Sequence, residues 1–214
     1  MKKFKVFDES QLNKLKKILH SADWQDGKAS ALGAAKDKKV NFQLASTDPL
    51  FKDIIPYVEQ VHQNEVVKAY TNIKALIDPR AALYRTGGKY GWHVDTTIMN
   101  NYRTDLSFTI CLNSPEDYEG GILSIDLQGS IAQFKGEAGE MIVYPSGYHH
   151  EVSPVISGER MVIVGWISSH IKEEGHRQRL YDLRMALHKL VLNYGHQELS
   201  EITKVYHQLN RDFS

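Results

Sequence analysis

The sequence of 214 residues contains a single cysteine, Cys111. One thiol excludes an internal disulfide, and this composition suits a reducing compartment such as the cytoplasm. Cys111 lies in the apolar segment LSFTICLN, where an inert core thiol is more common than a nucleophile. We therefore expect a cytoplasmic protein whose chemistry does not depend on cysteine.

An excess of charge of one sign is also absent, because 26 Lys and Arg residues balance 26 Asp and Glu residues. A balanced chain has no general attraction for nucleic acid or an anionic membrane. The longest apolar run, MVIVGWI at residues 161–167, is too short to span a bilayer. The basic start, MKKFKVFDES, lacks the apolar core of a signal peptide. We expect no nucleic-acid partner and no membrane partner.

The first of three segments, residues 1–72, carries helix signals. Asp8 and Gln11 form a capping pair before one apolar stripe, and Asp48 followed by Pro49 begins a second helix. We expect this segment to supply helical and strand support that packs on a central barrel. All three segments are expected to form one structural unit.

The second segment, residues 73–170, has a different period. Short runs of β-branched and aromatic residues alternate with the turn sequences TGGKYG, NSPEDYEGG, LQGS, KGEAGE, YPSGY and ISGE. Strands at this spacing favour a two-sheet jelly roll or barrel over alternating strands and helices. The predicted fold class is therefore mainly β with flanking helices.

The third segment, residues 171–214, returns to a helical period. One apolar stripe runs to Tyr194 and is stopped by Gly195, and a second stripe extends from Leu199 to Leu209. We expect a helical hairpin that packs on the barrel or against a second subunit. The second arrangement would make the protein a homodimer through its C-terminal helices.

The strand-like stretch YGWHVD contains a histidine and an aspartate two positions apart. Residues at i and i+2 of a strand point to the same face, so we expect His93 and Asp95 to share one face. If that face is buried, both groups need hydrogen bonds, an ion pair or a metal.

The stretch YPSGYHHEVSPVISGER contains two adjacent histidines, which point to opposite faces of a strand. Alternation groups His150 with Tyr148 and Val152 on an inward face and leaves His149 facing solvent. Arg160 begins the next apolar strand, and its guanidinium shares a face with apolar side chains. Such a position requires an anion to meet the charge.

Together, His93, Asp95 and His150 match the ligand set of non-haem iron oxygenases. Zinc hydrolases can use three such ligands as well, so the set alone is not decisive. The inward Arg160 favours iron, because it would pair with the far carboxylate of a dicarboxylate co-substrate that also chelates the metal. A third reading is a non-catalytic jelly-roll module that binds or senses iron or 2-oxoglutarate.

Four blocks of the sequence resemble bacterial PKHD-type hydroxylases, the prolyl/lysyl-hydroxylase-like branch of the iron(II)- and 2-oxoglutarate-dependent dioxygenases. They are LYRTGGKYGWHVD, DLSFTICLNSPEDYEGGILSI, GEMIVYPSGYHHEVSPVISGERMVIVGWI and RQRLYDL, in this order between Tyr84 and Leu183. The resemblance implies a distorted double-stranded β-helix, a jelly-roll variant of cupin-like type.

The resemblance also implies roles for individual residues. His93, Asp95 and His150 would bind iron(II), Arg160 would pair with the 5-carboxylate of 2-oxoglutarate, and Tyr84 would reach the same carboxylate. The implied reaction hydroxylates an unactivated C–H bond of a peptidyl or amino-acid-like substrate. It consumes O2 and 2-oxoglutarate, releases succinate and CO2, and uses ascorbate as reductant.

Two positions depart from the usual pattern of that family. Ile122 replaces an acidic residue in the turn GGIL, which we expect to change local polarity but not the metal site. Ile110 stands where some relatives supply a tyrosine to 2-oxoglutarate, so more of that task would fall to Tyr84. The peptide or small-molecule substrate is not written in any motif, because substrate choice depends on loops.

Overall fold

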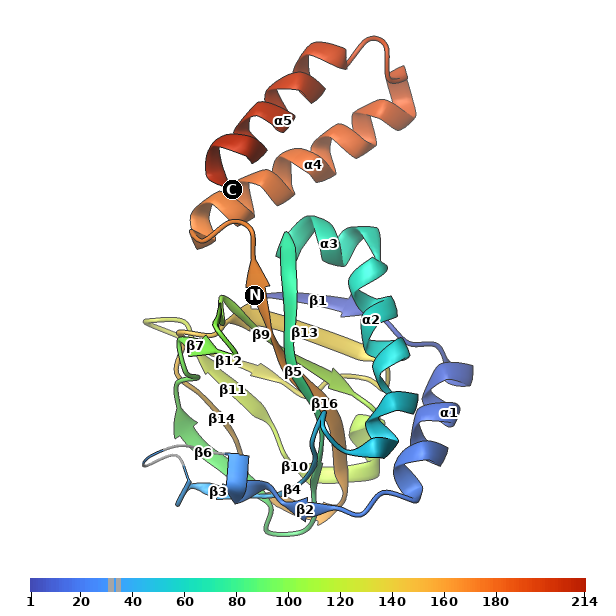
Figure 1. Cartoon of the computed structure of the whole chain (residues 1–214), viewed down its shortest axis with the longest axis vertical. Helices are drawn as coiled ribbons and strands as arrows, with labels where there is room; N and C mark the ends of the chain where they lie inside the picture. The colour runs from blue at the N-terminus through green and yellow to red at the C-terminus, as the bar shows by residue number, and fades with distance from the viewer. Residues whose placement is uncertain (31–32, 34–35) are drawn as a thin grey trace.

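Two antiparallel β-sheets form the centre of the protein, in a computed structural model that describes residues 1–30, 33 and 36–214 (Figure 1). The larger sheet has the strand order β1 (Lys2–Lys5), β13 (Glu140–Pro145), β9 (Leu106–Cys111), β16 (Arg160–Ser169), β5 (Ile73–Tyr84), β4 (Phe42–Leu44) and β2 (Gln25–Asp26). The smaller sheet has the order β12 (Ile131–Phe134), β11 (Leu123–Asp126), β14 (His150–Val152), β6 (Lys89–His93) and β3 (Lys39–Val40).

Two short strand pairs and several helices complete the fold. The strand pairs are β10 (Tyr118–Gly120) with β15 (Val155–Gly158), and β7 (Ile98–Met99) with β8 (Tyr102–Arg103). The α-helices are α1 (Glu9–His20), α2 (Ile55–Gln63), α3 (Glu65–Thr71), α4 (Glu174–Tyr194) and α5 (Ser200–Phe213). Short 3-10 turns occupy Gly27–Ser30, Pro49–Asp53 and Pro115–Asp117. The prediction of a mainly β fold with flanking helices and a two-sheet jelly-roll core is confirmed.

The larger sheet is covered on both faces, and all six residues of its central strand β9 are buried. On one face, α1, α2 and α3 cover a core that includes Leu15, Val58, Phe108 and Ile163. The opposite face meets the smaller sheet across a second core of apolar and aromatic side chains. The chain therefore folds into three layers, with helices, the larger sheet and the smaller sheet in that order (Figure 1).

Local sequence signals account for where the first helices begin. Asp8 caps α1 by accepting a hydrogen bond from the Gln11 backbone, and the Gln11 side chain accepts one from the Asp8 backbone in return. The helix expected after Asp48 begins instead as the 3-10 turn Pro49–Asp53, and α2 starts only at Ile55. A second proline, Pro56, occupies the first turn of α2, where its missing N–H leaves no hydrogen bond unmade.

The C-terminal helices form a hairpin that extends away from the sheets (Figure 1). The first half of α4 packs on α3, where the rings of Tyr70 and Tyr181 meet edge to face at 5.4 Å. Gly195, at φ +84°, ends α4 as predicted. Helix α5 contains no buried residue, and it leaves Ile202 and Val205 exposed. Among the described residues, no helix is both long and apolar enough to cross a bilayer.

A candidate metal centre in the pocket between the sheets

Two neighbouring strands of the smaller sheet bring His93 and His150 together. The two residues face each other in the pairing of β6 with β14, and their ring centroids are 4.2 Å apart. Each imidazole uses Nδ1 for a backbone carbonyl, His93 with Gly91 at 2.8 Å and His150 with Tyr148 at 2.9 Å. A carbonyl accepts only, so Nδ1 carries the proton. Each Nε2 therefore offers a lone pair to the pocket.

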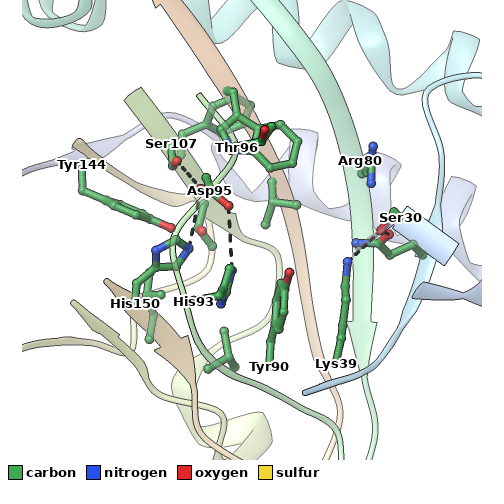
Figure 2. A pocket seen from close by; sticks show the side chains of 18 of the residues that line it. Ser30, Lys39, Arg80, Tyr90, His93, Asp95, Thr96, Ser107, Tyr144 and His150 are labelled. Atoms are coloured by element: carbon green, nitrogen blue, oxygen red, sulfur yellow. Dashed lines mark hydrogen bonds and ion pairs between the residues drawn. The ribbon is translucent and has the colours of Figure 1, made fainter. Parts of the chain in front are cut away.

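Asp95 reaches the same point from a loop rather than from the strand. Strand β6 ends at His93, so the expectation that both residues share one strand face is wrong in its geometry. The carboxylate of Asp95 nevertheless lies 3.8 Å from Nε2 of His93 and 3.6 Å from Nε2 of His150 (Figure 2). One ligand atom from each of the three residues lies within 4.8 Å of the others.

Ser107 on β9 fixes the orientation of the Asp95 carboxylate. Its hydroxyl donates to Oδ2 of Asp95 at 2.6 Å (Figure 2). The Ser107 oxygen also lies 2.8 Å from the Ser146 hydroxyl. A serine has one proton to donate, so Ser146 donates to Ser107 while Ser107 donates to Asp95. The larger sheet thus holds the carboxylate opposite the two histidines of the smaller sheet.

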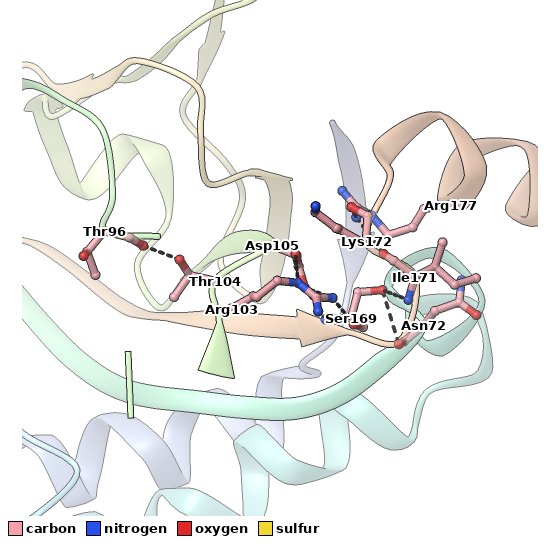
Figure 3. Close-up of polar contacts among 9 residues, drawn as sticks. All are labelled: Asn72, Thr96, Arg103, Thr104, Asp105, Ser169, Ile171, Lys172 and Arg177. Carbon is pink, nitrogen blue, oxygen red and sulfur yellow. Dashed lines mark hydrogen bonds and ion pairs between the residues drawn. The ribbon is translucent and has the colours of Figure 1, made fainter. Parts of the chain in front are cut away.

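The loop that carries Asp95 is tied down at its far end by a second polar network (Figure 3). Arg103 forms a two-point ion pair with Asp105, at 3.1 and 3.2 Å, and also donates to the backbone carbonyl of Ser169. Asp105 in turn accepts a hydrogen bond from the Ser169 backbone at 2.8 Å. The hydroxyl of Thr104 donates to the carbonyl of Thr96, next to Asp95. The far end of the loop is therefore anchored to the end of β16, and Thr104 connects the segment next to Asp95 to that anchored end.

The environment keeps the triad suited to a divalent cation. Burial, reinforced by the neighbouring His150, lowers the pKa of His93 to about 4, so its imidazole is neutral at pH 7. The ring of Tyr90 stacks on His93 with centroids 3.6 Å apart and 19° between the planes. Two neutral imidazoles and one carboxylate are the donor set of non-haem iron sites, with positions left open for other ligands. The residues present fit such a metal.

Arg160 and Tyr84 line the same pocket and lie opposite each other in the pairing of β16 with β5. Both side chains are buried, and the Arg160 guanidinium lies 5.0 Å from the centre of the Tyr84 ring. Within the described part of the chain, Nη1 of Arg160 has no hydrogen-bond partner. A buried guanidinium with an unused N–H donor is a suitable binding site for a carboxylate, which accepts the hydrogen bond.

Gly121 makes room for this guanidinium. It adopts φ +61°, and a Cβ atom there would lie 2.9 Å from Cδ of Arg160 and 3.0 Å from the Tyr118 ring. The glycine of the GGIL turn is therefore needed for both its conformation and its size. Ile122, which replaces an acid in that turn, is absent from the pocket wall.

Three further residues near the triad differ in whether they face the pocket. His149 is exposed, with its ring 6.1 Å from that of Trp92, and it does not join the triad. Ile110 belongs to the core beneath the helices, so it faces away from the pocket, and Thr109 beside it lines the wall instead. Tyr144 lines the pocket as well, with its ring 5.1 Å from His150.

Sequence reasoning missed Ser107, Tyr144 and two basic residues of the pocket wall, Lys39 and Arg80. One signal was present for Ser107, because two hydroxyl residues alternate in the otherwise apolar strand LSFTIC. Lys39 lies in a strand of two residues, which is too short to show any periodicity. Its burial depends on pairing with β6, far away in the sequence.

Comparison with known proteins identifies the relatives of this arrangement. Residues 79–168 match the 2OG-Fe(II) oxygenase superfamily. A PKHD-type hydroxylase of Aliarcobacter butzleri is 36% identical over 98% of this chain and 96% of its own length. An identity of this size over nearly the whole length of both proteins indicates common family membership.

Solved structures share the fold at much lower identity. A prolyl-4-hydroxylase of Pseudomonas putida superposes with a TM-score of 0.58 at 21% identity, over 79% of this chain and 92% of that protein. A prolyl hydroxylase of Trichoplax adhaerens, solved with a peptide fragment of the hypoxia inducible factor oxygen degradation domain, has a TM-score of 0.57. It is 16% identical over 78% of this chain and 83% of that protein.

Proposed function

The chain belongs to the PKHD-type hydroxylases of the 2OG-Fe(II) oxygenase superfamily, and from this membership we propose residue roles for its 2-oxoglutarate-dependent dioxygenase activity. His93, Asp95 and His150 bind iron(II), and Arg160 and Tyr84 bind 2-oxoglutarate. The convergence of the three ligand atoms within 4.8 Å is the observation that carries this proposal. Family membership favours it over a zinc hydrolase or a non-catalytic binding module.

Hydrogen bonds within the protein already hold the three proposed metal ligands in position. The backbone carbonyls of Gly91 and Tyr148 bind Nδ1 of the two imidazoles, which turns each Nε2 toward the metal position. The side chain of Asp95 is oriented by a hydroxyl donor, Ser107. These fixed partners reduce the reorganisation that binding would otherwise require.

Arg160 and Tyr84 define where the co-substrate lies. The guanidinium is almost fully buried, at 3% exposure, and its unused Nη1 donor supports pairing with the far carboxylate of 2-oxoglutarate. The Tyr84 hydroxyl adds a neutral donor, because burial raises the pKa of Tyr84 above its usual value. Arg160 orients the co-substrate through its far carboxylate, and the 2-oxo acid end of the co-substrate points toward the triad.

When bound, iron(II) supplies the oxygen chemistry that converts 2-oxoglutarate and O2 to succinate and CO2 while a C–H bond is hydroxylated. The chain's own contribution is to position the reactants and keep the pocket dry. Leu123, Val152 and Val164 line the wall with apolar side chains, which limits water near the reacting carbon. The substrate is peptidyl or amino-acid-like, a class supported by the prolyl hydroxylases of the same fold.

The proposal extends to four further properties. The chain acts as one structural unit, because β1 to β4 from its first 72 residues are hydrogen-bonded into both sheets. Ascorbate serves as reductant, as the family resemblance implies. The one thiol, Cys111, is free and buried, which supports a location in the cytoplasm. The exposed apolar residues Ile202 and Val205 of α5 support a homodimer through the C-terminal helices, testable by light scattering.

Succinate formation from 2-oxoglutarate, measured with iron(II) and ascorbate but without a prime substrate, tests the site assignment. We expect slow succinate release by the native protein, blocked by N-oxalylglycine, and none by Asp95→Ala or His150→Ala. His149→Ala is the matched control, because this neighbouring histidine is exposed and outside the triad. Near-normal succinate release by Asp95→Ala, or a loss in His149→Ala equal to that in His150→Ala, would overturn the assignment.

A further inference from the structure

The pocket that contains the triad has a second basic region, separate from Arg160. Lys39 enters from β3 of the smaller sheet and Arg80 from β5 of the larger sheet, and both line the pocket (Figure 2). In the β5–β16 pairing, Arg80 faces Val164 while Tyr84 faces Arg160. Four positions along a strand correspond to about 13 Å, so Arg80 lies far from the proposed 2-oxoglutarate carboxylate site.

Lys39 is a buried cation that has no ion-pair partner among the residues the structure describes. Its side chain belongs to a residue only 4% exposed, and its ammonium donates to the Ser30 hydroxyl at 2.8 Å. The Ser30 hydroxyl in turn donates a hydrogen bond to the side-chain oxygen of Gln43 at 2.5 Å. Over the described residues, no carboxylate lies within 4.0 Å of the Lys39 nitrogen. Among the described residues, the ammonium has one hydrogen-bond acceptor, the Ser30 hydroxyl, which leaves two of its three N–H donors without a partner there.

Arg80 likewise has an unused hydrogen-bond donor in this pocket. It is paired with Asp78, but its Nε is buried and has no hydrogen-bond partner among the described residues. Its guanidinium lies 5.7 Å from the centre of the Trp166 ring, and the Lys39 ammonium lies 4.9 Å from that of Tyr90. Within ion-pair distance, these two cations share one carboxylate, that of Asp78. Burial, followed by the charge of Arg80, lowers the pKa of Lys39 to about 8, and the carboxylates of Asp95 and Asp26 oppose this shift from beyond ion-pair distance.

We propose that Lys39 and Arg80 form a carboxylate-binding subsite for the prime substrate, which presents a carboxylate on the side of the triad away from Arg160. An ammonium, a guanidinium edge and two aromatic walls suit a flat monoanion that carries an aliphatic body. Lys39 is the one cation of the two without an ion-pair partner among the described residues, and a single such charge matches a carboxylate better than a phosphate dianion. The inference rests on the proposed function, and it narrows the substrate class to carboxylated amino-acid-like molecules or acidic peptide segments.

Selective binding of carboxylates tests the subsite. The probes are N-acetyl amino acids, each as free carboxylate and as carboxamide, together with the carboxamides of N-acetyl-aspartate and N-acetyl-glutamate. Their dissociation constants are measured by tryptophan fluorescence with iron(II) and 2-oxoglutarate bound and O2 excluded. We expect at least one free carboxylate to bind tenfold or more tightly than its carboxamide. If only the acidic carboxamides bind well, the carboxylate comes from a side chain within a peptide.

The variants Lys39→Met and Arg80→Gln should bring the carboxylate-to-carboxamide ratio close to one, and Lys39→Arg should restore part of it. Lys36→Gln, which removes an exposed charge three residues before Lys39, should keep the native ratio. The subsite is overturned if the native protein prefers neither free carboxylates over their carboxamides nor the acidic carboxamides over the neutral ones. It is also overturned if both charge-removing variants keep the native preference. A higher requirement for 2-oxoglutarate in these variants overturns it as well, because that would assign the two cations to the co-substrate.

The failure of this inference can be distinguished from failure of the proposed function. A native protein that forms succinate but shows no carboxylate selectivity contradicts the subsite alone. A native protein that forms no succinate contradicts the proposed function, and the binding ratio still decides whether Lys39 and Arg80 recognise carboxylates.

Discussion

The hydrogen bond from Ser107 to Asp95 offers a quantitative test of how the fold prepares its metal ligands. Replacing Ser107 with alanine removes a donor held 2.6 Å from the carboxylate and leaves an apolar group of smaller volume. A hydrogen bond to a charged group contributes about 1.5–3 kcal/mol. At 1.4 kcal/mol for each tenfold change, this is about a 10–100-fold weaker affinity for the metal. Loss of a partner that orients a metal ligand typically has an effect of about this size.

The affinity of Ser107→Ala for iron(II) can be measured by anaerobic calorimetry with 2-oxoglutarate present. Succinate formation as a function of iron concentration gives a second, independent value. Ser168→Ala is the matched control, because Ser168 is as deeply buried on β16 but lies outside the pocket. If Ser107→Ala binds iron within twofold of the native affinity, Asp95 does not need its hydroxyl partner and the reasoning fails.

Three further changes have defined outcomes. Arg160→Gln should raise the 2-oxoglutarate concentration for half-maximal succinate formation at least about 30-fold, because losing the ion pair weakens binding by on the order of 2 kcal/mol or more. An unchanged 2-oxoglutarate requirement would show that Arg160 does not bind the co-substrate. Gly121→Ala should also raise the 2-oxoglutarate requirement, because the added methyl group crowds Arg160. Gly87→Ala should leave the requirement unchanged, because Gly87 also has a positive φ but has no close neighbour. Burial lowers the pKa of His62 to about 4, below its unfolded value, so the protein should lose up to about 1.4 kcal/mol per unit as pH falls from 6.5 to 4. His62→Leu should reduce this dependence of the unfolding free energy on pH, as measured by urea unfolding. If the native protein and His62→Leu lose stability equally at acid pH, the low pKa of His62 is contradicted.

The parts of the fold that could be predicted depend on short-range patterns. The capping box of Asp8 and Gln11 and the stop at Gly195 are encoded within a few residues, and both occur as expected. Alternation in the strand around His150 separates it from its exposed neighbour, His149, for the same reason. The turn-rich middle of the chain predicts two packed sheets, because strands so closely spaced leave no room for crossover helices.

The features that escaped prediction depend on contacts between distant segments. Asp95 lies beyond the end of β6, and its position is fixed by Ser107 and by the Arg103–Asp105 network. No local pattern marks these pairings, since each becomes apparent only when β9 and β16 lie side by side. Lys39 appears as one lysine in a basic, hydrophilic stretch until β3 pairs with β6 and buries it.

Anomalous diffraction from a crystal grown with manganese(II) and N-oxalylglycine tests the central claim most directly, because manganese replaces iron without redox chemistry. We expect one strong manganese peak bonded to Nε2 of His93, Nε2 of His150 and a carboxylate oxygen of Asp95, with the distal carboxylate of the inhibitor on Arg160. A manganese peak elsewhere in the protein, or an inhibitor bound away from Arg160, would contradict the account.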